Sequence, residues 1–310
     1  MISRPTIVLG RILKQHIVIT SFRQLSYSSQ VLCSKKEYSQ ADFDKRVQEQ
    51  ISEINTGDNF VSKTKSAHEP PIGASSLPHP IWSDDEVRSI TITHRQPKGF
   101  IDWSAYLTVQ FLRKGFDILS GYNRKRDEGV WINRITFLET VAGVPGMVAA
   151  MVRHLNSLRR MERDHGWIHT LLEEAENERM HLMTALQLKK PSWMFRAGVV
   201  GTQGFFVTFF SLAYLISPKY CHRFVGYLEE EAVVTYTKCL LDIENENGCL
   251  KHWKTTPAPK VAITYWKLKP TATLLDVTLA IRADEAHHRV VNHTLGSMKK
   301  TDYNPYKPGE

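Results

Sequence analysis

The sequence predicts an all-α fold, a ferritin-like four-helix bundle with two additional helices and an extended N-terminal arm. Two observations carry this prediction. From Trp103 onward, apolar residues recur with the helical period of about 3.6, and few stretches alternate as strands do. Two helical segments also contain Glu-x-x-His, and the pairs are Glu178/His181 and Glu285/His288. Residues three apart share a helix face, and two such pairs are typical of bundles that hold two metal ions.

Six helical segments follow from the periodicity and from the glycines and prolines between them. Their expected bounds are 104–121, 130–158, 166–189, 192–216, 218–245 and 272–298. Ser192 suits an N-cap, and Pro218 suits the first turn of a helix. Gly248 and several prolines predict a loop over 246–271, and prolines also predict a non-helical tail over 301–310.

The N-terminal third predicts targeting and linking segments. Residues 1–33 are rich in arginine and serine, and no acid appears before Glu37, as is typical of a mitochondrial transit peptide. Residues 34–100 are polar and contain many prolines, which predicts an extended arm with little regular structure. The bundle domain is expected over 101–300.

Charge and cysteine content narrow the class of protein. The net charge is +8 and the pI about 9.2, but the basic residues are scattered and no nucleic-acid motif accompanies them. We therefore expect no nucleic-acid partner, and an anionic membrane surface suits the charge. The four cysteines form no Cys-x-x-Cys and predict no disulfide framework.

The segment 192–216 is the most hydrophobic part of the chain and is long enough to span a bilayer. It lies between the segment that carries Glu178 and the fifth segment, which would carry another metal ligand. A single crossing would put those ligands on opposite sides of the membrane, so we expect this helix to lie in the interface or to pack in the bundle. Segment 104–121 has an apolar stripe beside Arg113 and Lys114. The two helices together are expected to hold the protein to one leaflet.

A carboxylate-bridged site needs one further glutamate from each of two other helices. Glu139 is the only acid in a long apolar run, and an unpaired buried carboxylate costs several kcal/mol. The fifth segment offers three candidates, Glu229, Glu230 and Glu231, and periodicity alone does not choose among them.

A third Glu-x-x-His, formed by Glu162 and His165, has charged neighbours and lies at a helix junction. We expect it to be exposed. The spacing by itself is therefore weak support for a metal site, and the apolar context of the other two pairs carries the argument.

Four motifs together resemble those of the alternative oxidases, the mitochondrial cyanide-insensitive ubiquinol oxidases. The motifs are Leu138-Glu-Thr140, Asn177-Glu-Arg-Met-His-Leu182, Leu228-Glu-Glu-Glu-Ala232 and Arg282-Ala-Asp-Glu-Ala-His-His288. The resemblance covers roughly Trp103 to Met298 and implies a centre of two Fe ions. The implied metal ligands are Glu139, Glu178, His181, Glu229, Glu285 and His288.

The resemblance also implies roles for residues around the metal site. Tyr236 would be a redox-active tyrosine, and Asn177 and Asp284 could orient the ligating histidines. The residues implied to bind the quinol are Arg113, Asp117, Arg134, Leu138, Ala232 and Thr235.

The implied activity is oxidation of ubiquinol with reduction of O2 to water, which bypasses the cytochrome pathway and pumps no protons. The implied setting is a homodimer on the matrix side of the mitochondrial inner membrane. Plant-type members carry a regulatory N-terminal cysteine, but the only N-terminal cysteine here is Cys33, within or just after the transit segment. We therefore expect no thiol-linked activation by 2-oxo acids.

Two other classes remain open from the sequence. Another di-iron enzyme that acts on quinones, such as a demethoxyubiquinone hydroxylase, would not need Tyr236, and a plastid quinol oxidase would not suit the mitochondrial N-terminus. A ferritin-like iron-storage bundle should lack membrane-binding helices, which the apolar segment 192–216 disfavours.

Overall fold

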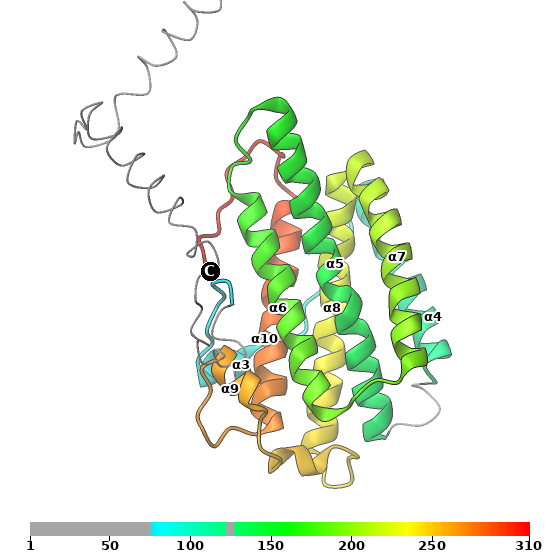
Figure 1. Ribbon diagram of the computed structural model, residues 1–310, viewed down its shortest axis with the longest axis vertical. Coiled ribbons are helices and arrows are strands. Elements are labelled where there is room, and N and C mark those ends of the chain that lie inside the picture. Colours follow the sequence, from blue (N-terminus) through cyan, green and yellow to red (C-terminus); the bar gives the residue numbers. More distant parts are fainter. Residues whose placement is uncertain (1–75, 122–126) are drawn as a thin grey trace, which may run out of the picture. The chain divides into compact units, whose positions relative to one another are not determined.

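A computed structural model describes residues 76–121 and 127–310, so the expected transit peptide and most of the arm lie outside the described residues. Within these ranges the chain is helical and contains no strand, which confirms the all-α prediction (Figure 1). The long helices are α4 (Gly99–Leu119), α5 (Glu128–Arg160), α6 (Trp167–Leu188), α7 (Trp193–Ile216), α8 (Pro218–Glu244) and α10 (Leu274–Leu295).

The helix starts agree closely with the sequence signals. The Ser192 hydroxyl caps α7 by accepting from Phe195 N at 3.3 Å, and Pro218 occupies the first turn of α8. Helix α4 begins at Gly99, earlier than the expected residue 104, and Phe100 extends its exposed apolar side. Pro218 is favourable in the first turn of α8, because a proline there removes no helical hydrogen bond.

Four of the long helices form the bundle. Helix α5 packs along α6, α8 packs along α10, and contacts between α5 and α8 and between α6 and α10 close the set. Glycines allow close approach: a Cβ on Gly146 of α5 would lie 2.6 Å from the carbonyl oxygen of Leu171 in α6. Likewise a Cβ on Gly226 of α8 would lie 2.6 Å from the His293 ring of α10.

Helices α4 and α7 lie on one side of the bundle, where α4 packs on α8 and α7 packs on α5 and α8 (Figure 1). By length and composition α5 and α7 could each cross a membrane. Helix α5 is a bundle member, whereas α7 buries only Phe210 and Tyr214. Large apolar side chains are exposed on both outer helices, and they include Phe100, Trp103, Leu107, Phe111, Ile118, Leu119, Trp193, Met194, Val200, Phe205, Phe209, Leu212, Leu215 and Ile216.

Two segments expected to lack regular structure contain short helices. The arm forms α3 (Asp84–Ser89), which starts with a capping box between Ser83 and Glu86. The expected loop 246–271 contains the 3₁₀ helix η1 (Lys251–Lys254) and α9 (Lys260–Tyr265). The prediction of a loop over 246–271 was wrong because one or two turns are too short to show a period. Such turns are stabilised by burial, which in α9 includes Tyr265.

Candidate metal centre

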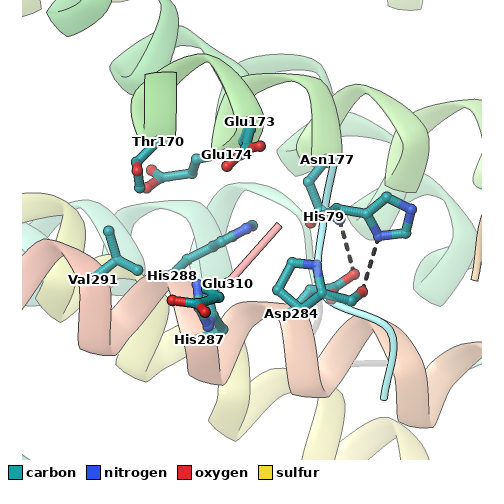
Figure 2. A pocket seen from close by; sticks show the side chains of 11 residues that line it. His79, Thr170, Glu173, Glu174, Asn177, Asp284, His287, His288, Val291 and Glu310 are labelled. Carbon is teal, nitrogen blue, oxygen red and sulfur yellow. Dashed lines mark hydrogen bonds between the residues drawn. The ribbon is translucent and has the colours of Figure 1, made fainter. Parts of the chain in front are cut away.

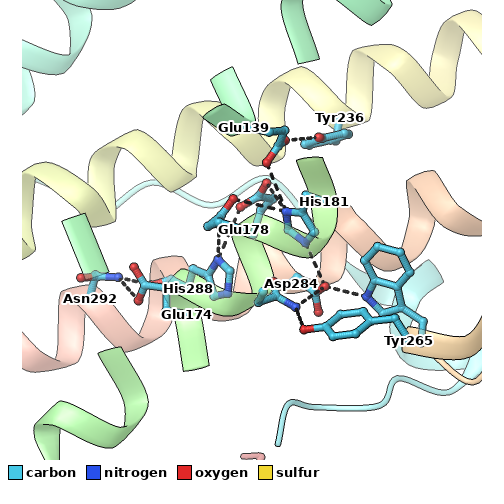
Figure 3. Close-up of polar contacts among 12 residues, drawn as sticks. Glu139, Glu174, Glu178, His181, Tyr236, Tyr265, Asp284, His288 and Asn292 are labelled. Atoms are coloured by element: carbon cyan, nitrogen blue, oxygen red, sulfur yellow. Dashed lines mark hydrogen bonds and ion pairs between the residues drawn. The ribbon is translucent and has the colours of Figure 1, made fainter. Parts of the chain in front are cut away.

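Six side chains from the four bundle helices converge in the interior of the bundle. Figure 3 shows Glu139, Glu178, His181 and His288 among them. Glu178 and His181 lie one turn apart on α6, and Glu285 and His288 repeat this arrangement on α10. Glu139 comes from α5, and Glu229 comes from α8. All six are buried, and His181 is fully inaccessible.

The six residues form two overlapping groups, in each of which the possible ligand atoms lie within 4.8 Å of one another. One group contains Glu139 and His181, and the other contains Glu229 and His288. Glu178 and Glu285 belong to both. Two shared carboxylates between two terminal pairs are suited to two adjacent metal ions bridged by glutamate.

The hydrogen bonding of these atoms fits a metal site. His288 Nδ1 lies 2.8 Å from Glu178 Oε1, and His181 Nδ1 lies 3.3 Å from Glu178 Oε2. These close pairs are not aligned as hydrogen bonds. Buried atoms left without a hydrogen-bonding partner are Glu139 Oε2, Glu178 Oε1, Glu178 Oε2, His181 Nδ1, Glu285 Oε2 and His288 Nδ1. Since native proteins rarely leave buried polar atoms unsatisfied, a cluster of this kind fits metal coordination. Carboxylate and imidazole are also donors that iron accepts.

The pKa values of the clustered carboxylates also favour a bound metal. Burial, and next the neighbouring carboxylates, raise the pKa of Glu229 well above its usual range. Burial likewise raises the pKa of Glu139 to about 8, although contact with His181 opposes this. At Glu178 burial is outweighed by the two histidines, which lower its pKa. So many carboxylates in one dry site attract cations, and bound metal ions would take the place of the protons.

Asp284 lies at the centre of a buried hydrogen-bond network beside His181. Its Oδ2 accepts from Trp266 Nε1 at 2.7 Å and from Asn177 Nδ2 at 3.0 Å. The same oxygen lies 3.1 Å from His181 Nε2, and Oδ1 accepts from Trp82 Nε1 at 2.6 Å. With Nε2 donating to Asp284, the Nδ1 lone pair of His181 faces the cluster, as a metal ligand requires.

Sequence reasoning missed the two tryptophans of this network. Trp82 is separated from Asp284 by 202 positions, and Trp266 follows a helix that was expected to be loop. No periodic signal marked either residue. A single indole in an irregular segment is ordinarily interpreted as a packed aromatic.

Tyr236 adjoins the cluster from α8, since its hydroxyl donates to Glu139 Oε1 at 2.5 Å (Figure 3). The side chain is buried. Burial, followed by the nearby carboxylates, raises the pKa of Tyr236 well above its usual range, so the phenol keeps its proton.

The structure separates the three consecutive glutamates of α8. Glu229 faces the metal cluster. Glu230 accepts from Arg95 N at 2.8 Å and lies 2.9 Å from His293 Nε2. Glu231 is paired with Arg113 Nη1 at 3.0 Å, an ion pair that the sequence did not predict.

Three residues of the expected quinol site form an ion-pair cluster between α4 and α5. Asp117 lies between two guanidinium groups, 3.2 Å from Arg113 Nε and 2.6 Å from Arg134 Nη2. The Arg134 guanidinium also lies 4.8 Å from the centre of the Phe116 ring. The cluster is largely shielded from solvent, and Arg134 is buried.

The other three residues expected to bind the quinol take no part in this ion-pair cluster. Leu138 and Ala232 are half-buried on α5 and α8. The Thr235 hydroxyl donates to the Glu231 carbonyl oxygen at 2.8 Å, so it is bonded within its own helix. The third Glu-x-x-His lies outside the centre: Glu162 is exposed and paired with Arg160 at 2.8 Å, while His165 is half-buried.

The fold and the site together define the class of protein. A helical bundle with a buried centre of four glutamates and two histidines is characteristic of the di-iron carboxylate proteins. Comparison with known proteins makes the assignment specific. The family model described as "Alternative oxidase" matches residues 82–297. The chain belongs to the alternative oxidase family, and it is therefore an oxidoreductase with the cyanide-insensitive quinol oxidase function that the sequence motifs implied.

Curated relatives agree along most of the chain. The alternative oxidase of Emericella nidulans is 48% identical over 275 residues, which cover 81% of this chain and 77% of the relative. That of Aspergillus niger is 51% identical over 241 residues, which cover 74% of this chain and 68% of the relative. Both relatives are named "Alternative oxidase, mitochondrial".

Proposed function

We propose that the chain is a ubiquinol:oxygen oxidoreductase whose two Fe ions are held by the six converging residues. The observation that carries the proposal is the cluster of buried carboxylate and imidazole atoms without hydrogen-bonding partners. Glu178 and Glu285 would bridge the ions, because each belongs to both ligand groups. When bound, the irons supply the redox chemistry by which O2 is reduced to water with electrons from ubiquinol.

The surrounding residues would prepare this site for its metal. Asp284 would fix the ring of His181 and its tautomer, and Asn177 would hold Asp284 in place through their 3.0 Å hydrogen bond. The six ligand side chains are buried among packed neighbours, so they would keep their positions during turnover.

Tyr236 would be the catalytic residue nearest the irons. Its hydroxyl proton is shared with Glu139 Oε1 over 2.5 Å, so removal of an electron from the ring can be coupled to transfer of that proton to the carboxylate. The raised pKa of Tyr236 keeps the phenol protonated until then.

The ion-pair cluster of Arg113, Asp117 and Arg134 would recognise the quinol head group. Guanidinium groups can donate to quinone oxygens and Asp117 can accept from a quinol hydroxyl. Leu138 and Ala232 would supply apolar surface, and Thr235 would add a hydroxyl. Arg113 and Asp117 belong to α4, whose outer surface is apolar, so a quinol could reach the cluster from that surface.

The outer helices α4 and α7 would bind one leaflet of the mitochondrial inner membrane from the matrix side. Their exposed apolar side chains face away from the bundle. A membrane crossing by α7 alone would separate α6 from α8, yet both contribute to one cluster. The relatives' names include "mitochondrial", which supports the compartment.

The chain would act as a homodimer. Exposed apolar residues follow one stripe along α5, namely Met147, Met151, Leu155 and Leu158. A stripe of that kind on a bundle helix is suited to a second copy of the chain, because it lies on a different helix from the two proposed membrane helices.

The test is to purify the full chain in lipid or detergent, measure its iron content and follow oxygen uptake with ubiquinol and cyanide. We expect two irons per chain and cyanide-resistant uptake, both lost in Glu178→Ala. An iron-free protein, or full activity in Glu178→Ala, would refute the proposal.

A further inference from the structure

A small cavity lies between α6 and α10 and reaches the metal centre at His288 (Figure 2). Its volume is about 20 Å³, enough for one water molecule. Helices α4 and α7 pack mainly on α5 and α8, not on these two helices. The cavity therefore opens away from the proposed membrane side, towards the aqueous phase.

The wall of this cavity is polar and includes an unsatisfied acceptor. Asn177 Oδ1 is buried without a hydrogen-bonding partner, while its Nδ2 is bonded to Tyr265 and Asp284. The Glu174 carboxylate lies on the same wall. A water molecule is stable in a cavity where two or more polar groups can bond to it, and these groups meet that condition.

Glu174 is held in place by a chain of buried hydrogen bonds that reaches it from α7. Asn292 Nδ2 donates to Glu174 Oε2 at 2.8 Å, and Asn292 Oδ1 lies 3.1 Å from His222 Nδ1. Burial lowers the pKa of His222 to about 4, so the ring is neutral. Its Nδ1–H must then donate to Asn292, and its Nε2 accepts from the Tyr214 hydroxyl at 3.1 Å. The orientation of the Asn292 amide towards Glu174 is thereby fixed.

The outer end of the cavity leads to solvent. Glu173 Oε1 accepts from Gly309 N at 3.1 Å and lies 3.3 Å from His169 Nε2. The His169 side chain is 41% exposed, and the exposed Glu310 also lines the cavity. Polar groups thus continue from His288 to the surface, where His79, Pro80 and the C-terminal Glu310 border the cavity.

The other cavity beside the metal ligands is a poor route for water. It has a volume of about 340 Å³ and adjoins Glu139. Its wall is formed mainly by apolar side chains, among them Val144, Met147, Val148 and Met151. Water in such surroundings finds few hydrogen-bonding partners, whereas an apolar molecule is favoured there.

We propose that the cavity between α6 and α10 is the passage by which product water leaves the metal centre, with Glu174 as the positioning residue that keeps it hydrated. The inference rests on the proposed function, in which one O2 and two ubiquinols give two waters and two ubiquinones. Water released beside His288 would pass Asn177 and Glu174 and leave past Glu173.

The test compares Glu174→Leu, which removes the polar wall, with Glu174→Gln, which keeps it. The control is Glu176→Leu, on the same helix but paired with Arg179 and outside the cavity lining. Each full-length holoenzyme is examined by crystallography for ordered water and by steady-state kinetics for kcat and for the KM of ubiquinol. Iron content is measured for each variant. Quinol oxidase activity of the wild type is measured first, so an inactive wild type would refute the proposed function before the water passage is tested.

We expect a water molecule within hydrogen-bonding distance of Asn177 Oδ1 in wild type, Glu174→Gln and the control, but not in Glu174→Leu. With two irons bound, Glu174→Leu should lower kcat about 10-fold or more at unchanged KM, because slower release of a product can limit turnover. A dry cavity in the wild-type crystal would overturn the proposal. So would wild-type kcat in iron-loaded Glu174→Leu. If that variant does not fold, Glu174→Met carries the same kinetic test.

Discussion

Replacement of Asp284 by asparagine tests whether the network around His181 supports the metal centre. The change keeps the shape of the side chain and removes its charge. One asparagine oxygen can still accept from Trp266, Asn177 and His181, but the new NH2 group faces the Trp82 indole N–H, which also donates. The perturbation therefore leaves the Trp82 indole N–H without its acceptor, adds two amide N–H donors that the carboxylate lacked, and makes the three remaining charge-assisted hydrogen bonds neutral.

The magnitude follows from those four contacts. An unsatisfied buried donor costs about 1–3 kcal/mol, and each of the three remaining bonds loses about 1 kcal/mol when its acceptor becomes neutral. Part of this loss is offset because a buried charge no longer has to be desolvated, so we expect a net destabilisation of about 3 kcal/mol. Weaker orientation of His181 should also lower iron affinity about 10-fold to 100-fold.

The assay is chemical unfolding of the metal-free protein, together with iron titration of the folded protein. Asp85→Asn is the control, because Asp85 is exposed and such substitutions change stability by about 0.5 kcal/mol or less. If Asp284→Asn unfolds at the same free energy as the wild type and binds iron equally tightly, the role given to Asp284 is refuted.

Three further predictions concern other parts of the molecule. Gly146→Ala should destabilise the chain by about 1–3 kcal/mol in urea unfolding, because the new Cβ would lie 2.6 Å from a backbone oxygen of α6. The control is Gly198→Ala, whose Cβ meets open space and should not destabilise the chain. Tyr236→Phe should leave iron content intact and lower kcat about 100-fold or more, measured as cyanide-resistant oxygen uptake; normal uptake would exclude a catalytic phenol. Burial lowers the pKa of His222 from 6.5 to about 4, so between these pH values the unfolded state binds the extra proton and stability falls as pH falls. Unfolding curves from pH 7 to pH 4 should show wild type losing about 3 kcal/mol more than His222→Gln, and parallel losses would contradict the assignment.

Some of the molecule could be predicted from local pattern alone. The six long helices and most of their ends follow from the apolar period and from caps such as Ser192, because helices form from interactions within a few residues, but the start of α4 at Gly99 was not predicted. The positions of Glu178/His181 and Glu285/His288 follow for the same reason, since spacing by three fixes a shared face. Short helices such as α9 escaped prediction because they are stabilised by distant packing.

The sequence by itself therefore determined the class of fold, the family motifs and the residue types of the metal centre. Only the tertiary structure decided which neighbour each polar side chain meets. Consecutive residues on a helix point about 100° apart, so Glu229, Glu230 and Glu231 face three different partners, which the packing of α8 against its neighbours selects. The same holds for Trp82 and Asp284, which lie 202 positions apart and meet only because the chain folds back on itself.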